Sequence, residues 1–81
     1  MTKNYELEFD RRSNAEEVLK VANNIFERKG YVVAEDFCDL MDDESLFDGL
    51  RVIWRSLDST KIVYKELENK WCIILPEGLE V

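Results

Sequence analysis

The strongest constraint on the fold is a helical repeat of apolar side chains between residues 15 and 26. Apolar residues recur there at steps of three and four, at Ala15, Val18, Leu19, Ala22, Ile25 and Phe26. This spacing lines one face of an α-helix, and Gly30 follows at a place where glycine commonly ends a helix in the left-handed conformation. We therefore expect a helix over residues 14–29, begun by a capping box between Ser13 and Glu16.

Three further segments have the composition of β-strands. Residues 5–9 alternate apolar and acidic side chains, which predicts a half-buried strand. Residues 60–66 and 70–75 are rich in β-branched and aromatic side chains and predict a hairpin around a turn at 67–69. Both faces of the last strand are apolar, as in a central strand. We expect the turn either to be wide or to hold Asn69 at positive φ.

A second, shorter helix is expected over residues 34–41, with acids in its first turn and Phe37, Leu40 and Met41 on one face. Aspartates near its end oppose the helix dipole, so the chain should leave the helix for a loop at 42–49. Residues 52–54 fit either a short strand or an irregular anchor.

The simplest architecture is a single small α+β domain over residues 1–81. Its expected element order is β-α-α-β-β, with a three-stranded antiparallel sheet and two helices packed on one face. Residues 77–81 follow Pro76 and are expected to form a loose tail.

The net charge of −7 lies in one segment of fourteen residues. Seven acids occur there without any Lys or Arg: Glu35, Asp36, Asp39, Asp42, Asp43, Glu44 and Asp48. In the rest of the chain, eleven acids match eleven bases. An acidic patch of this kind argues against a nucleic-acid partner, because binding to phosphates needs clustered Lys and Arg. The spacing of the acids does not fit an EF-hand loop, so no metal site is predicted.

The chain lacks the residues on which common catalytic sites depend. It has no histidine, and its three glycines are isolated, so neither a Ser-His pair nor a phosphate-binding loop is expected. Cys38 lies among carboxylates, which raise the pKa of a thiol and make it a poor nucleophile. Cys72 fits a core position. We therefore expect neither an enzyme nor a cofactor. The sequence shows no pattern of a signal peptide or a membrane span, so we expect a cytoplasmic protein.

The two tryptophans differ in their surroundings. Trp71 lies in the apolar last strand, which favours the core. Trp54 is flanked by Arg51 and Arg55 next to the acidic segment, and both a core position and an interface position remain open for it. The predicted interaction surface therefore consists of Trp54, the two arginines and the seven acids.

Three stretches of the sequence resemble a group of small proteins of unknown function encoded by phages and prophages. The first runs from Phe9 to Leu19 and contains Phe-Asp-Arg-Arg followed by Ala-Glu-Glu-Val-Leu. The second is residues 34–40, and the third comprises Trp54, Leu57 and the closing Ile-Ile-Leu-Pro. The chain departs from the group where Ile53 replaces a glycine and where Asn-Lys replaces an Asp-Gly turn. The resemblance implies an origin in a bacterial mobile element, and it implies no activity.

Together these observations predict a non-enzymatic module for protein–protein interaction or self-association. The expected partner is a phage or host protein, or a second copy, in the bacterial cytoplasm or in a virion. The alternative is an acidic decoy that occupies a host nucleic-acid-binding protein.

Overall fold

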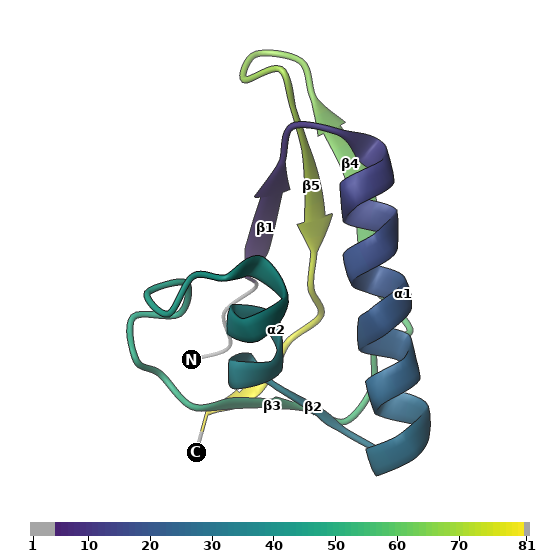
Figure 1. Cartoon of the computed structure of the whole chain (residues 1–81), viewed down its shortest axis with the longest axis vertical. Helices are drawn as coiled ribbons and strands as arrows, with labels where there is room; N and C mark the ends of the chain where they lie inside the picture. The colour runs from purple at the N-terminus through teal and green to yellow at the C-terminus, as the bar shows by residue number, and fades with distance from the viewer. Residues whose placement is uncertain (1–4, 81) are drawn as a thin grey trace.

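The larger of two antiparallel sheets follows the sequence pattern. The computed structural model describes residues 5–80. It pairs β1 (Glu6–Phe9) with β5 (Lys70–Ile74) and β5 with β4 (Lys61–Lys65), in the order β1-β5-β4 (Figure 1). Leu7 and Phe9 are buried while Glu6 and Glu8 are exposed, as the alternation predicts. The central place of β5 and the positive φ of Asn69, 54°, are both confirmed.

Helix α1 (Arg12–Lys29) covers one face of this sheet and packs against β5 and β1. It ends where predicted, at Gly30 with φ 80°. Its start is different, because Arg11 is the N-cap residue and no side chain caps the helix. The predicted capping box is wrong, since Ser13 already has helical backbone geometry and Glu16 pairs instead with Arg12 at 2.8 Å.

Helix α2 (Ala34–Met41) forms over the predicted residues and makes its main contacts with α1 and with β2 (Val32–Val33). The carboxylate of Asp36 accepts a hydrogen bond from the backbone N–H of Val33 at 3.1 Å, which satisfies a donor at the helix start. The chain leaves the helix at Asp42, in the left-handed conformation, as the opposed dipole predicts.

A second sheet corrects the predicted single sheet, the predicted order β-α-α-β-β and the placing of both helices on one face, because α2 packs on α1 and β2. This sheet joins β2, β3 (Val52–Trp54) and β6 (Leu79–Glu80) in the order β2-β3-β6. Residues 52–54 thus form a strand rather than an irregular anchor. The predicted loose tail at 77–81 is also wrong for residues 79 and 80, which pair with β3, and residue 81 lies outside the described residues. Strands of two or three residues are too short for alternation to reveal them.

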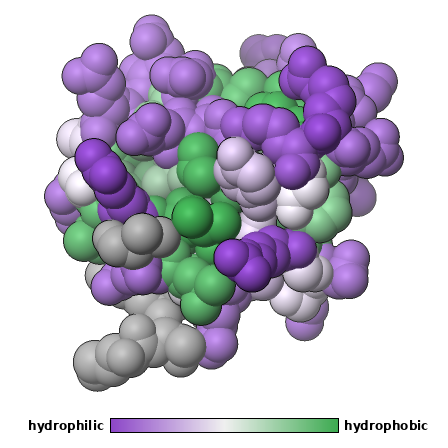
Figure 2. Space-filling model, turned by 90° about the horizontal axis from the view of Figure 1, so that it is seen from below, coloured by the Kyte–Doolittle hydropathy of each residue, from purple (hydrophilic) through white to green (hydrophobic). Residues whose placement is uncertain are grey.

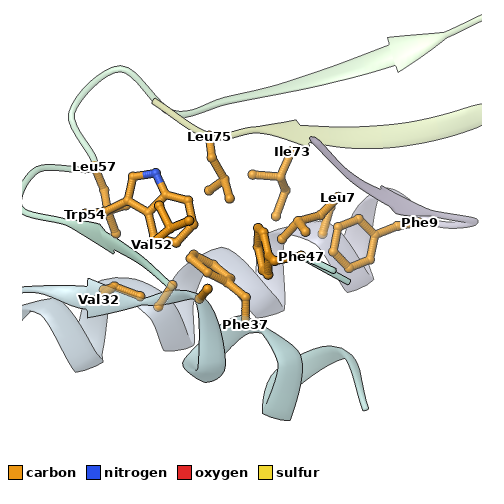
Figure 3. Packing of buried hydrophobic residues seen from close by; sticks show 13 residues of the cluster. Leu7, Phe9, Val32, Phe37, Phe47, Val52, Trp54, Leu57, Ile73 and Leu75 are labelled. Atoms are coloured by element: carbon orange, nitrogen blue, oxygen red, sulfur yellow. The ribbon is translucent and has the colours of Figure 1, made fainter. Parts of the chain in front are cut away.

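Trp54 lies at the centre of the core, with none of its surface exposed. Its ring contacts Phe37 at 5.3 Å, Phe47 at 5.7 Å and Tyr5 at 6.0 Å between ring centroids (Figure 3). The indole N–H donates a hydrogen bond of 2.7 Å to the carbonyl oxygen of Pro76. The prediction that Trp54 could be an accessible interface residue is therefore wrong, because the side chains of Tyr5, Phe37 and Phe47 and the backbone at Pro76 close around it.

The return of the chain from Pro76 to β6 requires a glycine beside Trp54. A Cβ atom on Gly78 would lie 2.2 Å from a side-chain carbon of Val52 and 3.0 Å from the indole ring. Any other residue would collide with the core at this position, so the glycine allows the C-terminal segment to lie directly on Trp54.

The buried side chain of Trp54 should contribute more to the free energy of unfolding than the half-buried side chain of Trp71. Trp71 packs against Tyr64 and Arg12, and its indole N–H has no hydrogen-bond partner among residues 5–80. We expect Trp54→Phe to lower the free energy of unfolding by about 1–3 kcal/mol, because it opens a cavity and orphans the Pro76 carbonyl. Trp71→Phe should cost under about 1 kcal/mol.

Urea unfolding followed by circular dichroism measures both changes. Equal losses for the two variants would contradict the assignment of Trp54 to the centre of the core.

Candidate interaction surface

The smaller sheet has one buried face and one outer face. Side chains alternate along a strand, and Val32, Val52 and Trp54 are buried in the core. Val33, Ile53 and Leu79 therefore lie on the opposite face, where Val33 is directly opposite Ile53 and Ile53 is opposite Leu79. These three residues form an apolar row across all three strands, which we call the outer row.

The outer row is open to solvent at one end and half-buried along the rest. Leu79 is 58% exposed, and Val33 and Ile53 are partly buried. Figure 2, seen from the side of the smaller sheet, shows apolar side chains gathered in the middle of this face with hydrophilic side chains around them. Residues at the edge of this sheet add to the apolar surface, since Tyr31 and Leu50 are each about two-fifths exposed, at 41% and 42%.

Arg51 and Arg55 lie on either side of Ile53 along the chain. Both are exposed, and neither forms an ion pair with any residue in the range 5–80. Arg51 precedes β3 and Arg55 lies in the bend that follows it, and each shares a hollow of the surface with Ile53 of the outer row. The two arginines therefore border one surface, with Ile53 rather than Trp54 between them.

Two open hollows flank the outer row. One, of about 350 Å³, lies at the start of α2 and is lined by Val33, Glu35, Arg51 and Ile53, among others. The second, of about 470 Å³, lies on the side of β6 and includes Arg55 and Leu79. Each hollow combines one arginine with apolar side chains and with carboxylates, Glu35 in the first and Asp58 and Glu77 in the second. A mixture of apolar and charged groups suits contact with another protein.

Most of the acidic segment lies outside these hollows. Only Glu35 shares one with an arginine. Asp36 receives Lys29 at 3.5 Å, and Asp43 accepts hydrogen bonds from the backbone and hydroxyl of Ser45. The other acids are exposed and have no ion pair in the described part of the chain: Glu35, Asp39, Asp42, Glu44 and Asp48. No group of three or more potential ligands among residues 5–80 could hold a metal ion.

The two thiols are kept in their protonated form. Burial raises the pKa of Cys38, and the nearby carboxylates of Asp43 and Asp39 raise it further. This confirms the predicted direction, although burial is the larger cause. Burial also raises the pKa of Cys72, which is fully enclosed.

A further hollow of about 370 Å³ lies between α1 and α2. Its walls are mostly apolar and include Phe9, Val18 and Met41, with Glu17 as their one ionisable group. A single exposed carboxylate offers no partner for acid–base chemistry. Within residues 5–80, no helix is long and apolar enough to cross a membrane.

The sequence indicated Arg51 and Arg55 but not the outer row. The sequence gives no sign that Ile53 lies on the outer face, because its larger apolar neighbour Trp54 dominates the segment and the two side chains point to opposite faces. The position of Leu79 could not be predicted either, because a single leucine between Gly78 and Glu80 belongs to no repeated apolar pattern.

No family model, curated protein or solved structure matches this chain.

Cys38 should react slowly with alkylating reagents at neutral pH. A raised pKa reduces the thiolate fraction, and the thiolate is the reactive form. Asp39→Asn removes one of the charges that raise this pKa, so we expect faster alkylation of Cys38 by iodoacetamide, measured by peptide mass spectrometry between pH 7 and 9. Asp48→Asn, whose charge does not act on Cys38, is the matched control. An unchanged rate in the Asp39 variant would contradict a contribution of the Asp39 carboxylate to the raised pKa of Cys38.

Proposed function

We propose that this chain is a non-enzymatic protein-interaction module that docks through the outer row and its two flanking arginines. The observation that carries the proposal is the continuous apolar row from β2 through β3 to β6. Single exposed apolar residues are ordinary on protein surfaces. A row that crosses three strands is more specific, because it offers a partner one contiguous surface.

The arginines strengthen this reading. Arginine is enriched at interface hot spots, where its planar group binds carboxylates at two points. Arg51 and Arg55 carry no ion pair among the described residues, so a partner could use both without breaking an existing contact. The partner that fits is a protein with acidic side chains on either side of an apolar one.

The proposal includes an origin. The resemblance of three stretches to phage and prophage proteins supports a bacterial mobile element as the source. It also supports a phage or host protein as the partner, met in the bacterial cytoplasm or in a virion.

Affinity capture from a lysate of the source bacterium tests the docking surface. R51E/R55E reverses both arginines. R11E/K20E makes the same change of charge at two exposed residues, the N-cap of α1 and a position within α1, which form no ion pair within residues 5–80. We expect the wild type and R11E/K20E to retain the same partner and R51E/R55E to lose it. Capture of the same partners by all three proteins would contradict the proposal.

The acidic decoy is a second candidate, favoured by the five exposed carboxylates that have no ion pair within residues 5–80. Its partner would be a nucleic-acid-binding protein that is released at about 0.5 M salt, where exposed charges are screened. D39N/D42N would weaken that capture, whereas R51E/R55E would leave it intact. The two candidates are therefore separated by which pair of substitutions removes the partner.

A further inference from the structure

The turn between β4 and β5 presents the most exposed apolar side chain in the described part of the chain. Leu67 is 104% exposed. Glu66 and Glu68, on either side of it, are both exposed and have no ion pair within residues 5–80. We call these three residues the hairpin tip.

The hairpin tip is held in a defined shape. The backbone N–H of Asn69 donates to the carbonyl of Glu66 at 3.3 Å, and the hydroxyl of Tyr64 donates to the side-chain oxygen of Asn69. Asn69 takes the left-handed conformation that the turn needs. A turn fixed in this way presents its leucine without a large loss of chain entropy on binding.

The hairpin tip and the outer row are complementary. The tip places an apolar side chain between two carboxylates, and the row places Ile53 between two guanidinium groups. An isolated leucine at full exposure gains most from an apolar surface. Glu66 and Glu68 are opposite in charge to Arg51 and Arg55, and because the same hollows also hold Glu35, Asp58 and Glu77, the charge complementarity is with the two arginines alone. Complementary charges of this kind fix the register of a contact.

The two surfaces lie at opposite ends of the molecule. In Figure 1 the β4–β5 turn is at one end of the longest axis and β2 and β3 are at the other. The longest extent is 33 Å, so the tip of a chain cannot fold back onto its own outer row. Contact between them joins two molecules head to tail, and such contacts generate open chains, or rings where the rotation closes.

We propose that the occupant of the outer row is the hairpin tip of a second copy of this chain. The inference rests on the proposed function, because it names the partner of the same surface. The contact is small compared with the roughly 800 Å² that each partner buries in a stable interface. Association is therefore weak, rises with concentration and weakens with salt.

Two variants test the hairpin tip and the outer row separately. E66Q/L67S/E68Q removes the apolar and charged groups of the tip, all of which are exposed, so folding should be unaffected. R51E/R55E disables the face and leaves the tip intact. Sedimentation velocity measures mass for each protein from about 10 μM to about 1 mM, the range of weak contacts.

We expect the mass of the wild type, and of R11E/K20E, to rise with concentration past the dimer. Each disabled variant alone should stay a monomer. Their equimolar mixture should form a heterodimer and nothing larger, because each pair of molecules has one intact outer row and one intact hairpin tip.

Three results would overturn the proposal: a wild type that stays monomeric at the highest concentration, a tip variant that associates like the wild type, or a mixture without heterodimer. If the wild type is monomeric but R51E/R55E still loses a captured partner, only the second-copy inference fails. If capture is also unaffected, the proposed function fails with it.

Discussion

The hydrogen bond from the indole of Trp54 to the carbonyl of Pro76 joins the smaller sheet to the segment that follows the larger sheet. β3 reaches the core from the middle of the chain, and the segment after Pro76 returns from the end of the larger sheet. The indole fixes the distance between them, and Gly78 lets the returning backbone lie on the ring. A buried N–H without an acceptor is costly. The burial of Trp54 therefore depends on the segment after β5, which brings the Pro76 carbonyl to the indole.

The same return creates the outer face of the smaller sheet. With Val52 and Trp54 directed into the core, Ile53 and its arginine neighbours must emerge on the other side. β6 then places Leu79 beside Ile53 and completes the outer row. The proposed docking surface is therefore a geometric consequence of the way that Trp54 is buried.

The parts of the fold with a repeated pattern could be predicted from the sequence. The periodicity of α1, the alternation of β1 and the two apolar faces of β5 each involve several residues, and each was confirmed. The smaller sheet could not be predicted, because β2 and β6 have two residues each and pair only through contacts between distant segments. Whether Trp54 is buried depends on residues 76–80, which lie more than twenty positions away. By contrast, the predicted turn at 67–69 already placed Leu67 at a hairpin tip.

Hydrogen exchange at the indole nitrogen of Trp54, followed by NMR, tests most directly whether this tryptophan holds the fold together. If the bond to Pro76 anchors β6, the indole proton and the amide of Ile53 should exchange together and only through global unfolding. Exchange of the indole proton at the rate of a free tryptophan, while the amides of β5 stay protected, would contradict this. The C-terminal segment would then open independently, and the outer row would not be a permanent surface.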